Sequence, residues 1–247
     1  MREYEVASHG LPPVLPSVGW RPRDGQHNFK VASWQAGVTK LLAKRLSPYA
    51  SRSVDVYAFG VYTGMGLRKI ADTLPAFGHL WAFDSFMGLP REPKSESHWS
   101  PYFREGGYSA ADAYNEHNLS ALVAQVHALV RRPNTTYIPG WYNESLTPQL
   151  LRRYSFQPAL LVDIDCDLFS SAFQALDWML TSRLLVPSSI VRYDDWPVWN
   201  ATRGDARGTT DYGESKAHRL ITALHNITWR RIEPEWQNAY QVRITSA

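Results

Sequence analysis

The feature that most constrains the fold is a continuous apolar run at residues 159–162 (ALLV), which leads directly into acidic residues. A strand with one face in water alternates apolar and polar positions, whereas this run has no polar position. Such a run is typical of a strand buried on both faces, as in a parallel sheet with helices on each side. We therefore expect an α/β fold with a mostly parallel sheet.

Extended and helical segments alternate along the chain, which favours one α/β domain. Apolar runs predict strands at residues 54–59, 79–83, 135–138, 159–162, 189–191, 228–232 and 240–244. Apolar residues at helical spacing predict helices at residues 33–46, 67–74, 109–130, 148–154, 173–180 and 217–224. No long helical segment separates the last two strands, so we expect them to form an antiparallel hairpin that completes a seven-stranded sheet. Residues 1–32 are rich in proline and glycine and predict an irregular arm before a single domain at 33–247.

The composition argues against several classes of protein. The 26 basic and 23 acidic residues give a net charge of +3, and the basic residues form scattered pairs instead of a stripe, so no nucleic-acid partner is expected. The single cysteine, Cys166, rules out a disulfide within the chain. No apolar run reaches the roughly 18 residues of a membrane span, and no apolar leader opens the sequence. These features predict a soluble cytoplasmic protein without a membrane span.

The asparagines point to a second compartment. Five of the eight asparagines begin an N-x-S/T sequon, namely Asn118, Asn134, Asn143, Asn200 and Asn226. Chance would supply about one, and such sites accept N-linked glycans in secreted proteins. Sequons go unread in the cytosol, so they do not exclude a cytoplasmic protein. A secretory-pathway lumen is the alternative compartment.

Two short motifs follow the first two predicted strands. Gly60, Gly64 and Gly66 follow the first strand, where glycine lets the backbone approach a ligand and lets the next helix pack on the sheet. Asp84 follows the second strand, 24 residues after Gly60, where an acid can accept hydrogen bonds from the ribose hydroxyls of a nucleoside. Each motif alone would also suit an ordinary turn or a helix cap. Together they predict a nucleoside-containing cofactor.

Acidic residues gather after the fourth and fifth strands: Asp163, Asp165, Asp167, Asp194 and Asp195. Two unit charges roughly 4 Å apart repel by about 4 kcal/mol at an effective dielectric constant of about 20. A bound divalent cation would offset this repulsion, and carboxylates without cysteine or histidine suit Mg²⁺. Separate helix caps and salt bridges are the alternative. Asp163 points to the opposite face from Ile164, and we expect it to contact the cofactor or to be structural.

Together, these segments resemble the macrocin O-methyltransferase family, relatives of catechol O-methyltransferase. The most specific segment is residues 83–90 (FDSFMGLP), because the family has a near-identical acid-Ser-Phe-x-Gly-Leu-Pro stretch after its second strand. Looser likenesses are found at residues 59–64 (FGVYTG), 107–109 (GYS), 140–148 (GWYNESLTP), 165–170 (DCDLFS) and 193–196 (YDDW). The likeness runs from about residue 57 to residue 224.

The resemblance implies a Rossmann-like class I methyltransferase fold and an O-methyltransferase that uses S-adenosylmethionine and Mg²⁺ or another divalent cation. It places Gly60, Tyr62 and Gly64 at the methionine and ribose of the cofactor, and Asp84 with its neighbour Ser85 at the ribose hydroxyls. It implies the metal ligands Asp165, Asp194 and Asp195, with Asp167 as a further member. Asp165 and Asp194 would be catalytic through that metal.

Three positions depart from the family pattern, of which Phe169, in place of a usual tyrosine, is a mild change. Ala58 stands where the family often has an acid, which puts the grip on the amino group of the cofactor in doubt. Arg192 places a charge within an otherwise apolar strand, so that strand is either partly exposed or pairs Arg192 with an acid.

The general base and the acceptor are less constrained. His98, His117 and Glu144 are the candidates for the base. The expected acceptor is a hydroxyl of a sugar, a glycosylated molecule or a phenol, because aromatic residues gather in the predicted loops: Trp99, Tyr102, Phe103, Trp141, Tyr142, Trp196 and Trp199. A homo-oligomer is compatible with this sequence.

Two other functions stay open. Asp165-Cys166-Asp167 is a DxD sequence, which in glycosyltransferases holds Mn²⁺ and a nucleotide sugar, and the sequons would fit a Golgi lumen. A non-catalytic protein with the methyltransferase fold is the other alternative, favoured by Ala58 but not by the intact acidic motifs.

Overall fold

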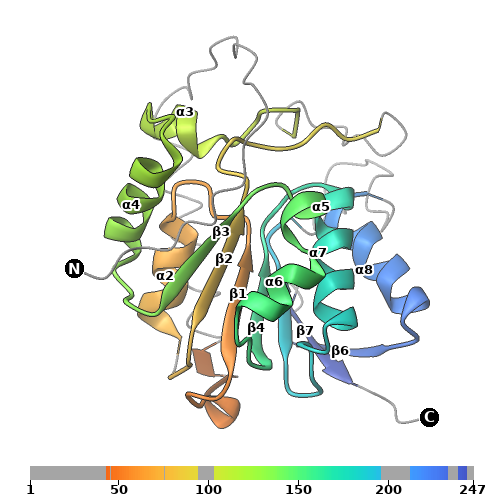
Figure 1. The fold of residues 1–247 in the computed structure, drawn as a ribbon. Coiled ribbons are helices and arrows are strands. Elements are labelled where there is room, and N and C mark those ends of the chain that lie inside the picture. Colours follow the sequence, from red (N-terminus) through yellow and green to blue (C-terminus); the bar gives the residue numbers. More distant parts are fainter. Residues whose placement is uncertain are drawn as a thin grey trace, which may run out of the picture.

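A twisted sheet runs through the computed structural model, and helices cover both of its faces (Figure 1). The structure describes residues 43–44, 46–74, 76–93, 103–195, 212–232 and 239–243. Its strands are β1 (Asp55–Phe59), β2 (Leu80–Asp84), β3 (Thr135–Pro139), β4 (Ala159–Ile164), β5 (Ile190–Tyr193), β6 (Thr228–Ile232) and β7 (Ala239–Arg243). Its helices are the 3₁₀ turn η1 (Ser47–Tyr49), α2 (Met65–Thr73), α3 (Ala110–Tyr114), α4 (Leu119–Val130), α5 (Tyr142–Ser145), α6 (Pro148–Arg153), α7 (Phe169–Thr181) and α8 (Gly213–Leu224).

The strands lie in the order β3-β2-β1-β4-β5-β7-β6. The first five strands of the chain are parallel to one another, and β7 runs antiparallel to both β5 and β6. The predicted α/β fold with a mostly parallel sheet is therefore confirmed. Right-handed β-α-β connections account for this arrangement, because each helix must cross back over the sheet to start the next parallel strand.

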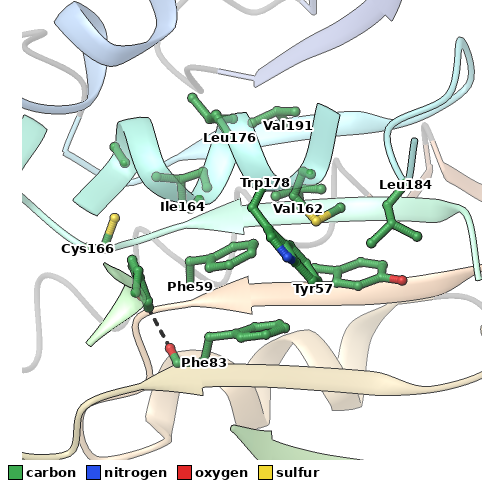
Figure 2. Packing of buried hydrophobic residues seen from close by; sticks show 14 of the residues in the cluster. Tyr57, Phe59, Phe83, Val162, Ile164, Cys166, Leu176, Trp178, Leu184 and Val191 are labelled. Atoms are coloured by element: carbon green, nitrogen blue, oxygen red, sulfur yellow. Dashed lines mark hydrogen bonds between the residues drawn. The ribbon is translucent and has the colours of Figure 1, made fainter. Parts of the chain in front are cut away.

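Alternate residues of each central strand enter two different cores. From β1, Val56 and Ala58 pack with the helices α2 and α4, whereas Tyr57 and Phe59 pack with the layer of α5 to α8. The central strands β1, β2 and β4 are buried on both faces, which explains the apolar run that begins β4. Figure 2 shows the second core, where the rings of Phe59 and Phe83 stack with their centroids 4.6 Å apart.

The helix expected at residues 109–130 is divided into α3 and α4. Asn115 ends α3 in the left-handed conformation, with φ of 51°. Asn118 then caps α4 by accepting a hydrogen bond from the backbone N–H of Ala121. Asparagine favours both positions, so the break follows from local turn chemistry that the apolar periodicity hides. The short helix α5 was not predicted either.

Several sequence-based expectations fall outside the part of the chain that the structure describes. They include the arm at 1–32, most of the helix expected at 33–46 and the sequon at Asn200. The other four sequon asparagines, Asn118, Asn134, Asn143 and Asn226, are exposed. Among the described helices, none combines the length and the apolar character that crossing a membrane requires.

The edge of the sheet opposite the carboxyl ends is held by a buried acid. Asp55 is 2% exposed and begins β1. Its carboxylate accepts hydrogen bonds from the backbone N–H of His79 at 2.8 Å, the indole N–H of Trp81 at 2.8 Å and the backbone N–H of Gln157 at 3.0 Å. One side chain therefore ties together the segments that lead into β1, β2 and β4.

We expect Asp55→Ala to lower the free energy of unfolding by about 3 kcal/mol, because it leaves buried donors without an acceptor. Urea denaturation followed by circular dichroism measures this loss. Asp72→Ala is the control, since Asp72 is 56% exposed in its ion pair with Arg68 and should change stability by less than about 0.5 kcal/mol. Equal losses in the two variants would refute the tethering role of Asp55.

Candidate functional site

The carboxyl ends of β1, β2, β4 and β5 meet at one edge, where parallel sheets bind their ligands. Backbone hydrogen bonds extend the sheet by one residue into the loops at this edge. The N–H of Gly60 donates to Phe83, that of Asp165 to Phe59 and that of Asp194 to Ile164, each at 2.9 Å. The loops that carry the predicted site residues therefore start from fixed points.

Close contacts and positive φ angles require two glycines of the turn after β1. Gly60 has φ of 97°, and a Cβ atom there would lie 1.7 Å from the carbonyl oxygen of Asp165. Gly64 has φ of 84° at the N-cap of α2, and a Cβ atom there would lie 2.8 Å from the side chain of Val126. Any side chain at Gly60 would push the turn away from the first acidic segment.

Asp84 holds the glycine turn by its carboxylate. Oδ2 accepts hydrogen bonds from the backbone N–H groups of Val61 at 2.6 Å and Tyr62 at 2.8 Å, and Oδ1 accepts one from Phe86 at 2.6 Å. A carboxylate offers about four lone-pair directions, so about one stays available to a ligand. The sequence did not predict this structural role, which exists beside any contact with a ribose.

Ser85 shapes the turn that follows Asp84. Its hydroxyl donates to the carbonyl oxygen of Gly88 at 2.7 Å and accepts from the N–H of Met87 at 3.1 Å. Leu89, which follows Gly88, donates a backbone hydrogen bond to the carbonyl oxygen of Gly107 and accepts one from the N–H of Gly106. Both hydrogen bonds of the Ser85 hydroxyl are thus internal to the base of the long loop, and its predicted contact with the cofactor stays a prediction.

Three of the predicted metal ligands come together. Asp165, Asp194 and Asp195 are partly buried, and one carboxylate oxygen from each lies within 4.8 Å of the others. Asp167 lies beside Asp195, in a left-handed backbone conformation with φ of 63°. The acidic trio, Asp165 with Asp194 and Asp195, has the donor chemistry and the spacing that suit a hard divalent cation.

Electrostatics also favour a cation at the acidic trio. Burial, followed by the charges of Asp194 and Asp195, raises the pKa of Asp165 well above its usual value. Burial and the charge of Asp194 raise the pKa of Asp195 to about 6. Burial and Asp195 likewise raise the pKa of Asp167 well above its usual value. A divalent cation would stabilise the ionised forms that these neighbours disfavour.

Arg192 is the buried countercharge at this edge. Its guanidinium donates hydrogen bonds to the carboxylates of both Asp163 and Asp194. Burial alone would lower the pKa of Arg192, but Asp163 and Asp194 raise it above its usual value, so it stays charged. The sequence left open whether β5 is partly exposed or pairs Arg192 with an acid, and the structure shows the pairing. Asp163 is 4% exposed, and its Oδ1 accepts the hydrogen bond from Arg192.

Glu214 belongs to the same edge, and sequence reasoning missed it. It lies in the first turn of α8, is fully buried, and accepts hydrogen bonds from the N–H groups of Cys166 and Asp195. Its partners are 48 and 19 residues away, so no local pattern reveals them. The only signal in the sequence is an acid at the start of a helix, which usually marks favourable interaction with the helix dipole.

Two tyrosines adjoin the acidic residues. The rings of Tyr62 and Tyr108 meet edge to face with their centroids 5.7 Å apart. Tyr108 is 39% exposed, and burial followed by the charges of Asp167 and Asp195 raises its pKa. Its phenol therefore stays protonated. Tyr142, in contrast, is a core residue whose hydroxyl donates to the carbonyl oxygen of Phe83.

Four of the eight described non-glycine residues with positive φ lie around the site. Tyr62, Phe86, Tyr108 and Asp167 have φ values between 49° and 63° without being glycine. Each lies in a loop at the carboxyl edge of the sheet. A non-glycine residue in this conformation costs about 1 kcal/mol or more, and such residues cluster at ligand sites.

Neither His117 nor Glu144 makes a described hydrogen bond or ion pair with the acidic trio. His117 is exposed in the turn between α3 and α4, and Glu144 is exposed on α5. His98, Trp99, Tyr102, Trp196 and Trp199 lie outside the described residues. The roles of His117 and Glu144 stay predictions.

No protein-family model and no curated protein sequence matches this chain. Among solved structures, the chain is similar to CalS11, a calicheamicin methyltransferase, with a TM-score of 0.60 and 18% identity over 88% of this chain and 80% of that chain. It is also similar to the O-methyltransferase NovP, with a TM-score of 0.54 and 16% identity over 86% of this chain and 80% of that chain. At these identities the likeness concerns the fold, and this chain has the fold of those two methyltransferases.

Proposed function

We propose that the protein is an S-adenosylmethionine-dependent, divalent-cation-assisted O-methyltransferase that acts on a hydroxyl of a sugar, a glycosylated molecule or a phenol. The observation that carries the proposal is the contact between Gly60 and the backbone of Asp165. It brings the turn that suits a nucleoside cofactor against the acidic trio that suits a cation. The fold shared with CalS11 and NovP, both described as methyltransferases, supports the same activity.

The cofactor would bind at the glycine turn. Gly64 caps α2 without a side-chain hydrogen bond, so the first N–H groups of this nine-residue helix are available to a carboxylate such as that of methionine. Asp84 fixes the turn through Val61 and Tyr62 and keeps about one acceptor direction for a ribose hydroxyl. Ala58 offers no charge to the amino group, so that group needs another partner.

The cation would be held by Asp165, Asp194 and Asp195. When bound, a divalent cation lowers the pKa of an acceptor hydroxyl and stabilises its ionised form. The protein supplies the placement: Arg192 orients Asp194, and the loop of Asp165 is fixed against Gly60. Tyr108 keeps its proton and can donate a hydrogen bond to an acceptor oxygen at the same edge.

Proton removal falls most naturally to Asp167. It adjoins Asp195 without belonging to the acidic trio, so its carboxylate is available to accept the proton that leaves the acceptor hydroxyl. This assignment replaces the need for His117 or Glu144 to reach the site.

A DxD glycosyltransferase is less well supported. That function needs Asp165 and Asp167 to hold the cation, whereas the structure groups Asp165 with Asp194 and Asp195. Binding of a nucleotide sugar with Mn²⁺, without binding of S-adenosylmethionine, would favour it.

Isothermal titration with S-adenosylmethionine tests the cofactor site. We expect saturable micromolar binding by the native protein and at least about tenfold weaker binding by Asp84→Asn, because the amide cannot accept all three N–H groups of Val61, Tyr62 and Phe86. Asp72→Asn on the exposed face of α2 is the control and should bind as the native protein does. Absence of binding by the native protein would refute the proposed function.

The acidic trio predicts a pH-dependent stability. Because the pKa of Asp195 rises from 3.8 to about 6 on folding, its protonated form stabilises the fold below about pH 4, and that stability is lost as pH rises through about 6. The shift corresponds to at most about 3 kcal/mol. We therefore expect Mg²⁺ to raise the melting temperature more at about pH 7 than at about pH 4, since only the ionised site binds a cation well.

Differential scanning fluorimetry across this pH range checks the expectation. Asp195→Asn should lose less stability than the native protein as pH rises, and it should respond less to Mg²⁺. Asp112→Asn, an exposed position on α3, should follow the native profile. A response to Mg²⁺ that is the same at both pH values would contradict a cation site at these carboxylates.

A further inference from the structure

Glu214 is a buried carboxyl that the proposed chemistry does not use. It is 0% exposed and lies in the first turn of α8, between the buried residues Gly213 and Ser215. An acid at this place in a helix ordinarily interacts with the N–H groups of its own first turn. The described hydrogen bonds of Glu214 go instead to two other segments of the chain.

The two oxygens of Glu214 reach the two acidic segments. One accepts a hydrogen bond at 3.2 Å from the N–H of Cys166, which stands between Asp165 and Asp167. The other accepts a hydrogen bond at 3.0 Å from the N–H of Asp195. A single rigid carboxylate thus spans the loop after β4 and the loop after β5, which together supply the acidic trio.

Glu214 also lies next to the residues that would hold a cation. Its two partners, Cys166 and Asp195, directly follow Asp165 and Asp194 in the chain. A change in either hydrogen bond would therefore shift the backbone that carries the acidic trio.

Direct coordination of a cation does not explain Glu214. Among the described residues, the ligand atoms that lie within 4.8 Å of one another come from Asp165, Asp194 and Asp195 alone. Both oxygens of Glu214 are already directed at backbone N–H groups. Glu214 would act on a cation only through the residues that it holds.

We propose that Glu214 is a positioning residue, whose two backbone hydrogen bonds set the spacing of Asp165 from Asp195 and thereby the affinity for the cation. This inference rests on the proposed function, because it needs the acidic trio to bind a metal. Removing an outer partner that orients metal ligands typically weakens metal binding by about 10- to 100-fold.

The decisive variant is Glu214→Asp. It keeps the negative charge but is one methylene shorter, so it cannot reach the N–H groups of Cys166 and Asp195 together. Glu214→Gln keeps the length but presents an amide donor to one of these N–H groups. Glu116→Gln is the matched control, because Glu116 also accepts a backbone hydrogen bond, from Asn118 at 2.8 Å, in the turn between α3 and α4.

Binding of Mn²⁺, followed by the electron paramagnetic resonance of the free ion, is the readout. We expect both Glu214 variants to bind Mn²⁺ at least about tenfold more weakly than the native protein and Glu116→Gln to bind it equally well. Binding of S-adenosylmethionine, measured without a divalent cation, should be retained in the Glu214 variants, which shows that the fold is intact. If Glu214→Gln does not fold, Glu214→Asp carries the test.

Each outcome separates the inference from the function on which it rests. Native Mn²⁺ affinity in Glu214→Asp would overturn the positioning role, since charge alone would then suffice. A native protein that binds S-adenosylmethionine but no Mn²⁺ would overturn both the metal site and this inference. Weaker Mn²⁺ binding in both variants, with cofactor binding retained in the absence of a divalent cation, supports it.

Discussion

Arg192 places one guanidinium between Asp163 and Asp194, and the acidic edge of the sheet depends on this buried charge. A planar fork of donors can serve two carboxylates at once, which an ammonium group does less well. Asp163 is its partner on the neighbouring strand, in register with Arg192. The pair therefore fixes Asp194 just beyond β5, where it can join Asp165 and Asp195, and leaves the charge of those two carboxyls for a cation to balance.

Much of this architecture could be predicted from short patterns in the sequence. The apolar run of β4 required two covered faces, and the alternation of strands and helices then required parallel neighbours. Once the strands were parallel, their carboxyl ends had to share an edge, so the acids after β4 and β5 had to approach the turn after β1. The approach of Asp165, Asp194 and Asp195 follows from topology together with the positions of the strand ends.

Other parts of the site could not be predicted because they depend on contacts between distant segments. Glu214 reaches Cys166 across 48 residues, and the three N–H groups that Asp84 holds are visible only once the turn is folded. The break between α3 and α4 was missed for a different reason: the apolar residues at helical spacing all lie in α4, and the expected helix was extended back past Asn115, whose conformation ends α3. Periodicity records which face is buried, and it does not record where the backbone stops being helical.

Gly60 leaves no space between the turn after β1 and the carbonyl group of Asp165, so the two loops share a boundary. A displacement of either loop must then move the other, because packed backbone atoms do not compress. Two ligands bound on opposite sides of such a boundary influence each other's free energy of binding, and thermodynamic linkage makes that influence reciprocal. If a bound cation changes the affinity for a nucleoside by some factor, the bound nucleoside changes the affinity for the cation by the same factor, whichever of the two binds first.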